Sequence, residues 1–236
     1  MSGRYDRQIP LIGESGQRKL SASTVGIAGC GGLGNIVVTD LASAGIGRMI
    51  LADPDVPDVS NLNRQFVFRE GDAEMKANIL SLWARQLNPD TEAIPYCGAL
   101  DRENLPSVFG KCDVLIDCLD TLKGRLALNQ YAVSSGKTLV HGGVSGYSGQ
   151  VTVVVPGKTP CLECIYGDAK ENGMPSPSIS PAVSAVGSLE ALQAVQILTG
   201  TGEPLIGRMA ILDMEKNVFE TVPILPRDGC TVCGRP

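Results

Sequence analysis

The feature that most constrains this chain is a glycine-rich run between an apolar segment and an amphipathic one. The run GCGGLG at residues 29–34 follows the apolar segment 24–28 and leads into residues 34–44, where apolar residues recur at helical spacing. Glycines let the backbone approach a phosphate, and a helix start offers oriented N–H groups. The run predicts a strand–loop–helix unit that binds a nucleotide. A glycine turn needed only for close helix–strand packing has the same pattern.

Alternating strand and helix patterns continue through the first 145 residues. Strands are predicted at 24–28, 49–52, 92–96, 114–116 and from 138 to 140, and helices at 14–20, 34–44, 72–87 and 125–135. Such alternation indicates a doubly wound, Rossmann-like, mostly parallel α/β sheet.

The pattern changes after residue 145. A strand at 150–155, a Pro/Ser-rich loop at 167–181 and a helix at 181–198 precede a predicted antiparallel hairpin, 209–212 with 218–222. We expect one domain over residues 1–236, with a nucleotide-binding half at 1–145 and a second half at 146–236.

Charge and hydropathy exclude two classes of partner. Lys and Arg number 20 against 25 Asp and Glu, a net charge of −5, so no basic surplus favours nucleic acid. Gly, Asp or Glu interrupts the apolar stretches before the roughly 18 residues of a membrane span. The start, MSGRYDRQIP, lacks a hydrophobic signal core. We therefore expect a cytoplasmic protein without nucleic-acid or membrane partners.

The polar residues that follow help to distinguish which nucleotide binds. Asp53 ends the second strand, 19 residues after Gly34, where it could accept hydrogen bonds from ribose hydroxyls. The glycine run and Asp53 fit NAD and ATP equally well. The polar loop 54–69 distinguishes them, because it is too long for a simple turn and carries SNLNRQ at residues 60–65 beside the carboxyl ends of the strands.

The charges in this region suit a triphosphate and a metal ion. Arg64 and the neighbouring amides suit phosphate oxygens better than a nicotinamide ring. Lys76, in the first turns of the next helix, adds a second cation, and Asp120, just past the strand 114–116, could hold Mg²⁺. The predicted ATP-binding residues are Gly29, Gly31, Gly32, Gly34, Asp53, Asp55, Ser60, Asn61, Asn63, Arg64, Gln65, Lys76, Asp120 and Thr121.

Two CxxC pairs predict a structural zinc site. Cys161 with Cys164, and Cys230 with Cys233, supply the ligand number and spacing of a tetrahedral Zn(Cys)₄ centre. A redox dithiol or disulfide is the alternative. Four thiolates leave no open coordination position, so the site should stabilise the fold rather than catalyse.

Together these motifs resemble the ThiF/MoeB/HesA family, the bacterial and archaeal relatives of ubiquitin-activating enzymes. The resemblance covers roughly residues 4–234. It rests on RYDRQ at 4–8, GCGGLG at 29–34, LADPD at 51–55 with SNLNRQ at 60–65, Lys76, DCLD at 117–120, GQVTVV at 149–154 and the two CxxC pairs, in the family's order.

The resemblance implies ATP-dependent adenylation of the C-terminal Gly carboxylate of a ubiquitin-like sulfur carrier, MoaD-like or ThiS-like, with release of pyrophosphate. It implies that Gly32 faces the phosphates, Asp53 the ribose, and Asp120 the Mg²⁺. Asn61, Arg64 and Lys76 would bind the triphosphate. Arg7 resembles the arginine that these homodimers insert into the partner's ATP site, so Arg7, Arg64, Lys76 and Asp120 are the expected catalytic residues. The zinc-stapled half 146–236 would bind the acceptor.

Two departures from the family pattern leave alternatives open. Thr121 stands where the family often has Asn, and residues 165–229 contain no cysteine that could form a thioester. Adenylation of a small-molecule or peptide carboxylate, in cofactor or natural-product biosynthesis, is therefore the main alternative. An NAD-dependent oxidoreductase and a non-catalytic nucleotide-binding scaffold are weaker ones. Cys30, Cys97, Cys112 and Cys118 are expected in the core, and His141 is expected to be a packed side chain rather than a catalyst.

Overall fold

One mixed sheet of eight strands organises the part of the chain that the structure, a computed structural model, describes: residues 3–170 and 176–234. The order across the sheet is β3-β2-β1-β4-β5-β6-β7-β8. The strands are β1 (Thr24–Ala28), β2 (Arg48–Ala52), β3 (Glu92–Tyr96), β4 (Val114–Asp117), β5 (Thr138–Ser145), β6 (Ser148–Val154), β7 (Arg208–Asp213) and β8 (Val218–Pro223).

The direction of the strands divides this sheet into two parts. Strands β3, β2, β1, β4 and β5 are parallel, and β6, β7 and β8 continue the sheet in antiparallel order. β5 belongs to both parts, because it pairs with β4 in parallel and with β6 through a tight turn. The predicted doubly wound fold with C-terminal antiparallel strands is confirmed.

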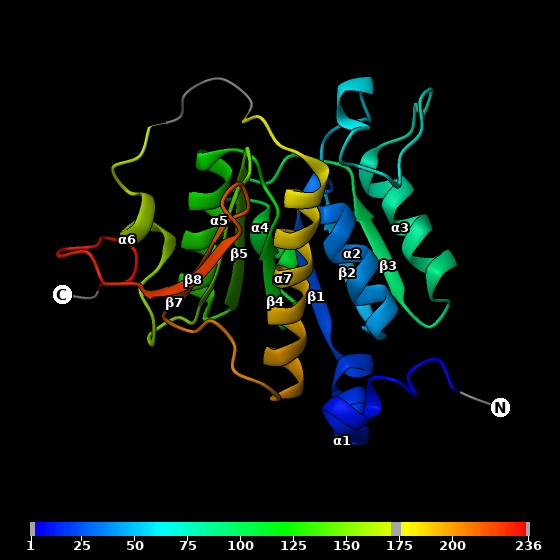
Figure 1. Ribbon diagram of the computed structural model, residues 1–236, viewed down its shortest axis with the longest axis horizontal. Helices are drawn as coiled ribbons and strands as arrows, with labels where there is room; N and C mark the ends of the chain where they lie inside the picture. The colour runs from blue at the N-terminus through cyan, green and yellow to red at the C-terminus, as the bar shows by residue number, and fades with distance from the viewer. Residues whose placement is uncertain (1–2, 171–175, 235–236) are drawn as a thin grey trace.

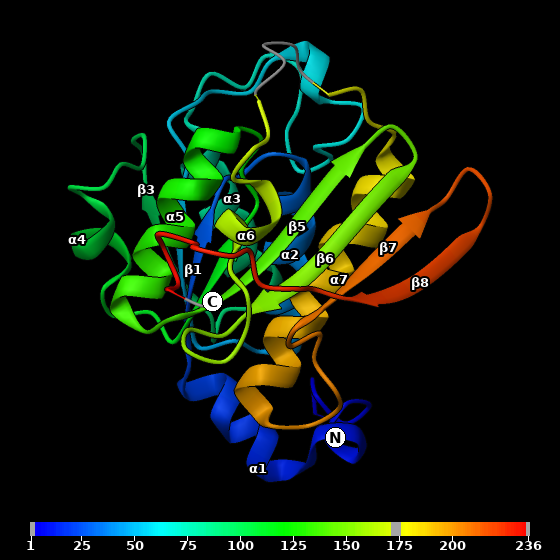
Figure 2. The same ribbon diagram turned by 90° about the vertical axis from the view of Figure 1, so that its left-hand side faces the viewer.

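Helices cover both faces of the sheet (Figures 1 and 2). The helices are α1 (Ile9–Ala22), α2 (Gly32–Ala44), α3 (Lys76–Leu87), α4 (Leu105–Phe109), α5 (Leu122–Ser135), α6 (Leu162–Tyr166) and α7 (Ser180–Thr199), with a 3₁₀ turn η1 (Val59–Asn61). Residues of α2, α3 and α7 share one hydrophobic core with the sheet, and residues of α4, α5 and α6 share another.

The parallel strands are buried on both faces. Ile116 enters the core beneath α2 and α7, whereas its neighbour Leu115 enters the core beneath α4 and α5. Continuous apolar runs such as residues 24–28 are the sequence expected of strands buried in this way. The two cores fix where the strands end, so the loops that follow start from rigid positions.

Several element boundaries differ from the sequence prediction. Helix α3 begins at Lys76 instead of residue 72, because the Asp72 side chain accepts a hydrogen bond from the N–H of Arg69 at 2.7 Å and closes a separate turn. Helices α4 and α6 were not predicted, since five residues are too few to show a helical period. The centre of the predicted loop 167–181 lies outside the described residues.

Gly187 and Glu190 interrupt the apolar residues of α7, as predicted, although the helix as a whole resembles a membrane span in composition. This 20-residue helix is long and apolar enough by composition, with a mean hydropathy of 1.2 over 18 residues. Half of that window is buried, and the helix packs along α2, β5 and β6. This burial identifies α7 as a core helix, because its apolar residues pack against α2 and the sheet.

Candidate functional site

The predicted nucleotide residues gather where β1 and β4 end side by side. Helix α2 follows β1 on one face of the sheet, whereas α5 follows β4 on the other. This is the topological switch point, where open α/β sheets bind their ligands. The glycine loop 29–34, the loop 53–65 after β2 and the turn 118–121 after β4 all start from this edge.

Two glycines of the loop stand where no larger residue fits. Gly29 has a φ of +98°, and a Cβ there would lie 2.5 Å from the carbonyl oxygen of Cys118. A Cβ at Gly34 would overlap the carbonyl oxygen of Gly29. Helix α2 begins at Gly32 with Gly31 as its N-cap residue, so the loop leads directly into a helix N-terminus. This is the arrangement that binds phosphates through backbone N–H groups.

Asp53 holds the glycine loop in position. One carboxylate oxygen accepts the N–H of Cys30 at 2.7 Å, and the other accepts the N–H of Asp55 at 2.9 Å. Burial raises the pKa of Asp53, whereas these two N–H groups act in the opposite direction. Asp53 thus orders the backbone of two adjoining loops, and its contact with a ribose stays a prediction.

Asn35 is a site residue that sequence reasoning missed. It is fully buried, and its Nδ2 donates to the carbonyl oxygens of Cys30 and Gly31, both at 3.0 Å. Its Oδ1 accepts the N–H of Val67 at 3.0 Å. Asn35 therefore ties the glycine loop to the far end of the loop 54–69. The available signal was an amide inside the apolar helix segment that follows the glycines.

A capping box orders the start of the SNLNRQ segment. The Asp58 side chain accepts hydrogen bonds from the Oγ of Ser60 at 2.5 Å and from its N–H at 2.8 Å. These bonds, the side-chain one first, lower the pKa of Asp58. Asn61 Oδ1 in turn accepts the N–H of Asp58 at 3.2 Å. Ser60 and Asn61, both predicted ATP ligands, form the η1 turn in this structure.

The end of the same segment returns to the glycine loop. Arg64 donates to Asn63 Oδ1 at 2.7 Å, and its Cγ would lie 3.6 Å from a Cβ on Gly32. Gln65 is 4% exposed, and its Oε1 has no hydrogen-bond partner within the described residues. The Nε2 of Gln65 would lie 3.5 Å from a Cβ on Gly31. The aliphatic part of Arg64 and a buried amide thus border the glycines.

Lys76 supplies a largely buried cation at the start of α3. Its side chain is 8% exposed, and its Nζ lies 3.3 Å from Oδ2 of Asp55, whose side chain is 64% exposed. The backbone N–H of Lys76 donates to the carbonyl oxygen of Asp55 at 2.9 Å. The ammonium group is therefore held at the ligand-binding edge of the sheet by a partner that water also solvates.

The turn after β4 presents Asp120. Both backbone groups of Leu119, the residue before Asp120, are held. Its N–H donates to Asp117 Oδ1 at 3.1 Å, and its carbonyl oxygen accepts from Arg125 Nη2 at 2.5 Å. Asp120 is exposed, and Thr121 caps α5 with its side chain. An exposed carboxylate at a rigid turn suits Mg²⁺, which retains several water ligands.

Arg7 lies far from the nucleotide loops of its own chain. The neighbouring Gln8 donates to the carbonyl oxygen of Ala44, at the C-terminal end of α2, at 2.7 Å. Helix α2 has 13 residues, so about 20 Å separates this end from the glycine loop. Figure 1 shows the N-terminal segment and α1 at the opposite end of the molecule from the loop after β2. One chain does not bring Arg7 to the predicted site.

The two CxxC pairs meet in space. All four Sγ atoms lie within 4.8 Å of one another, with Cys161 3.8 Å from Cys230 and Cys164 3.5 Å from Cys233. Zn–S bonds of about 2.3 Å in a tetrahedron place sulfurs about 3.8 Å apart. The four-cysteine cluster could therefore hold a metal ion, and it joins α6 to the C-terminal segment, which lie side by side in Figures 1 and 2.

The surroundings of the four-cysteine cluster differ from one thiol to another. Burial raises the pKa of Cys161 to about 12, and the Asn129 side chain opposes that rise. Burial would also raise the pKa of Cys230, but the N–H groups of Cys233 and Val232 outweigh it and lower that pKa to about 7. The buried Asn129 also accepts the N–H of Leu162 at 2.9 Å through its Oδ1, which anchors the start of α6. No sequence pattern pointed to Asn129 as a site residue.

His141 is packed, as expected, within a chain of polar side chains. Its Nδ1 lies 2.8 Å from Asp117 Oδ2, and its Nε2 lies 2.8 Å from the hydroxyl of Tyr166. Gln150 Nε2 also donates to that hydroxyl. Burial lowers the pKa of His141 although Asp117 acts against it, so the ring is neutral at pH 7. Nδ1–H therefore donates to Asp117, and Nε2 accepts from Tyr166.

Glu190 is a second buried acid, on the opposite face of the sheet. Its carboxyl group lies where a Cβ on Gly142 would be, and neither of its oxygens has a hydrogen-bond partner within the described residues. Burial, followed by the charge of Asp117, raises the pKa of Glu190 well above its usual range. This rise favours the protonated form of Glu190.

The remaining cysteines are poor nucleophiles or lie apart from the site. Burial raises the pKa of Cys30, Cys112 and Cys118, that of Cys112 to about 12, so these thiols carry little thiolate. Cys97 was expected in the core, and this is wrong: it is exposed just past the end of β3, where its thiol lies 3.3 Å from Asn78 Oδ1.

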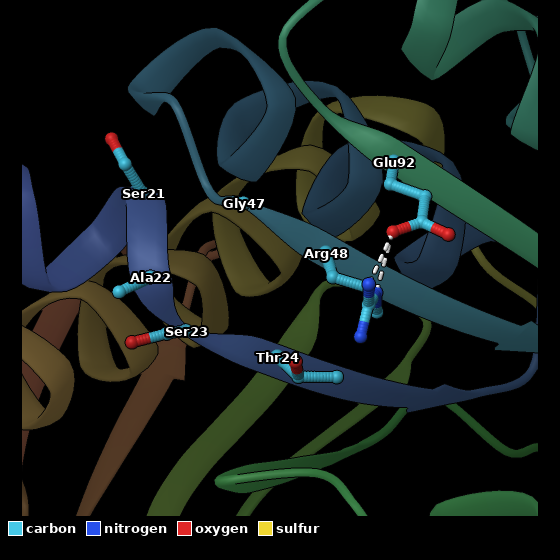
Figure 3. A pocket seen from close by; sticks show the side chains of 7 residues that line it. All are labelled: Ser21, Ala22, Ser23, Thr24, Gly47, Arg48 and Glu92. Atoms are coloured by element: carbon cyan, nitrogen blue, oxygen red, sulfur yellow. Dashed lines mark hydrogen bonds and ion pairs between the residues drawn. The ribbon is translucent and has the colours of Figure 1, made fainter.

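A pocket of about 180 Å³ lies at the amino ends of β1, β2 and β3, opposite the ends where the predicted nucleotide loops start (Figure 3). The ion pair between Arg48 and Glu92, with N and O 2.6 Å apart, crosses it, and both side chains are about half exposed. Ligands of parallel sheets bind at the carboxyl ends of the strands, so this pocket is not part of the nucleotide site.

Comparisons with known proteins show which family the chain resembles. The model of the ThiF family matches residues 5–232. The SAMP-activating enzyme E1 of Haloferax volcanii is 35% identical over 239 residues, which cover 98% of this chain and 88% of that protein. The sulfur carrier protein ThiS adenylyltransferase of Escherichia coli is 34% identical over 238 residues, covering 98% and 94%.

A solved structure of similar fold contains both a nucleotide analogue and a second component. The crystal structure of E. coli MccB with AMPCPP and MccA superposes with a TM-score of 0.88 at 25% identity, covering 98% of this chain and 74% of MccB. The similarity extends over both parts of the sheet, because nearly all of this chain is covered.

Proposed function

Because the chain belongs to the ThiF family and is an adenylyltransferase, we propose that its substrates are Mg·ATP and a ubiquitin-like sulfur-carrier protein. The C-terminal glycine carboxylate of the carrier is adenylated, and pyrophosphate is released. The acyl-adenylate then accepts sulfur for cofactor biosynthesis.

The observation that carries this proposal is the meeting of four groups at one edge of the sheet. The glycine loop 29–34 offers N–H groups to the phosphates, and Arg64 and Lys76 neutralise the triphosphate. Asp120, on its fixed turn, would hold the Mg²⁺. Asp53 receives the ribose, and Asn61 and Gln65 supply amides.

The chemistry needs alignment and charge neutralisation rather than a protein base. The acceptor carboxylate is already the nucleophile, and it attacks the α-phosphorus while the bond to the pyrophosphate oxygen breaks. Mg²⁺, when bound, draws negative charge from the phosphates. Lys76 is suited to the same task, because its ammonium group is largely buried and engaged only by a solvated carboxylate.

Zinc is the metal proposed for the four-cysteine cluster. The donor set is four soft sulfurs at tetrahedral spacing, which fits Zn²⁺ and not Mg²⁺. Bound by all four, the ion would fasten the C-terminal segment to α6 and leave no open position for catalysis. A redox dithiol remains the alternative for these cysteines.

The position of Arg7 supports a homodimer with shared ATP sites. Arg7 is exposed, and the segment that carries it is anchored at the far end of α2 from the glycine loop. The guanidinium group would therefore act in the site of the partner chain, where it adds a third cation to Arg64 and Lys76.

The acceptor is proposed from relatives that share more sequence with this chain than MccB does. The Haloferax and E. coli adenylyltransferases, at 34–35% identity, are named for small protein carriers, whereas MccB, at 25%, was solved with MccA. A peptide or small-molecule carboxylate is thus the second candidate, and the absence of cysteine in 165–229 favours it. An NAD-dependent oxidoreductase finds no support among these relatives. Residues 146–236 would form the acceptor-binding half.

A cytoplasmic location follows from the same proposal, because ATP and sulfur carriers are used there. All eight cysteines are free thiols in the structure, which suits a reducing compartment. The net charge of −5 gives no reason to expect nucleic acid as a partner.

ATP–pyrophosphate exchange tests the proposal directly. Purified enzyme, Mg·ATP and labelled pyrophosphate are incubated with a carrier that ends in Gly-Gly, with the same carrier lacking its last glycine, or with a short peptide that ends in a free carboxylate. Exchange only with the intact carrier supports the proposal. Exchange only with the peptide establishes the second candidate, and no exchange with any acceptor contradicts both.

A further inference from the structure

A chain of hydrogen bonds runs from the four-cysteine cluster to the turn of Asp120. Helix α6 carries Cys164 and, two residues later, Tyr166. The Tyr166 hydroxyl meets His141 Nε2 at 2.8 Å, and His141 Nδ1 meets Asp117 Oδ2 at 2.8 Å. Asp117 Oδ1 then accepts the N–H of Leu119 at 3.1 Å.

We propose that Tyr166, His141 and Asp117 form a positioning relay. The relay couples the position of α6, which the four-cysteine cluster holds, to the conformation of the turn that carries Asp120. The proposal rests on the proposed function in one respect: Asp120 binds Mg·ATP. None of the three relay residues touches the reacting atoms, so they are positioning residues.

The geometry favours a relay over an ordinary buried polar cluster for two reasons. His141 and Asp117 are fully buried on neighbouring strands, so neither side chain can exchange its partner for water. The bonds also converge on Asp117, which accepts from Nδ1–H of the neutral His141 and from the N–H of Leu119, while Nε2 of His141 accepts from Tyr166. A buried chain of this kind has one satisfied arrangement, and losing one member leaves the next without a partner.

Helix α5 provides a second tie between the Asp120 turn and α6, because α5 starts next to Asp120 and its Asn129 accepts the N–H of Leu162 at 2.9 Å. Arg125, also on α5, binds the carbonyl oxygens of Leu119 and Gly142. Among the described residues, the relay is the connection from the N–H of Leu119 to the helix that carries Cys164. Gln150, on β6, donates to the Tyr166 hydroxyl and holds it toward His141.

The first test removes one hydroxyl group. In Tyr166→Phe, backbone amide hydrogen exchange in the peptide that contains Leu119 and Asp120 should rise about fivefold, the effect of one lost hydrogen bond of about 1 kcal/mol. Exchange in the glycine loop 29–34 should not change. Tyr131→Phe is the matched control, because Tyr131 lies partly buried on α5 outside the relay. Equal exchange in both variants would overturn the proposal.

The second test measures binding of Mg²⁺ with a non-hydrolysable ATP analogue by calorimetry. Tyr166→Phe should weaken Mg²⁺-dependent binding about fivefold and leave the metal-free binding of the analogue unchanged. His141→Gln should keep more of the affinity than His141→Leu, because an amide can donate to Asp117 and accept from Tyr166. If His141→Leu does not fold, the comparison of Tyr166→Phe with Tyr131→Phe still decides.

The third test addresses the four-cysteine cluster. Removing zinc with a chelator should raise exchange at the Leu119–Asp120 peptide in the wild type but add little in Tyr166→Phe. An unchanged turn after zinc loss would break the proposed link. Should the wild type show no pyrophosphate exchange with any acceptor while the hydrogen-exchange results hold, the proposed function fails and the relay stands.

Discussion

Replacing Lys76 with Met should lower the rate of catalysis while leaving the stability of the fold nearly unchanged. The Lys76 side chain is 8% exposed, so Met fills the same space and keeps its packing at the start of α3. Among the described residues, the ion pair with Asp55 is the one side-chain interaction of the Lys76 ammonium group that is lost. Because Asp55 is 64% exposed and its charge is solvated, that pair contributes about 0.5 kcal/mol or less.

The expected effect on catalysis is far larger. If Lys76 neutralises charge that develops on the triphosphate, its removal should lower the exchange rate about a hundredfold to a thousandfold, or ~2.7–4 kcal/mol. The assay is ATP–pyrophosphate exchange at saturating acceptor, with urea denaturation of the same preparation. Lys137→Met is the matched control, because the Lys137 Nζ donates to a carbonyl oxygen, that of Cys112, at 2.8 Å away from the site.

Two results would refute this reasoning. Exchange within about threefold of wild type would remove Lys76 from the triphosphate site. A loss of stability above roughly 2 kcal/mol would show that the ion pair matters to the fold and that solvent does not screen it as argued. Lys137→Met should change neither quantity by a comparable amount.

Four further predictions follow from other parts of the structure. Arg7→Ala and Asp120→Ala should each abolish most exchange, and mixing the two chains should restore a fraction, because one hybrid site is complete; a monomer by light scattering would contradict this. Each chain should contain one zinc ion by metal analysis, and Cys164→Ala should lower the melting temperature by more than about 5 °C; normal melting would argue against a structural metal. Intact mass spectrometry without reductant, after incubation with Mg·ATP and acceptor, should find unmodified enzyme and acyl-adenylate, since the thiols of Cys30, Cys112 and Cys118 are buried with raised pKa values; a thiol-sensitive adduct would overturn this. Finally, burial lowers the pKa of His141, so below about pH 6.5 the unfolded chain binds a proton that the folded chain does not. The free energy of unfolding should therefore decrease as the pH is lowered, by at most ~1.4 kcal/mol per pH unit. Urea denaturation of His141→Gln should show a weaker decrease at acid pH, and an equal decrease would be evidence against a neutral His141.

Much of the architecture could be predicted from local sequence patterns. Apolar runs of four or five residues indicated strands buried on both faces, and the structure places β1 and β4 there. The glycine run was informative because a side chain at Gly29 or Gly34 would collide with neighbouring backbone. The need for glycine at these positions is visible in the sequence as the residue type itself. Boundaries were less certain, as at Lys76, where a separate turn closed by Asp72 delays the helix.

Other features depended on contacts between distant segments. Asn35 and Asn129 look like ordinary helical amides in the sequence, yet each is fully buried and holds a loop or a helix start in place. Cysteine is a residue type common in protein cores, but Cys97 lies just past the end of the edge strand β3, where no further strand covers it.

The sequence by itself therefore determined the fold class, the glycine loop and the pairing of the two CxxC motifs, because each depends on residue types at short, fixed spacing. Only the tertiary structure decided how His141, Asp117 and Tyr166 combine and that the segment carrying Arg7 is anchored at the end of α2 that lies about 20 Å from the glycine loop. Strand order and helix packing set these distances. They arise from the burial of apolar faces across the whole chain, and no short stretch of sequence encodes them.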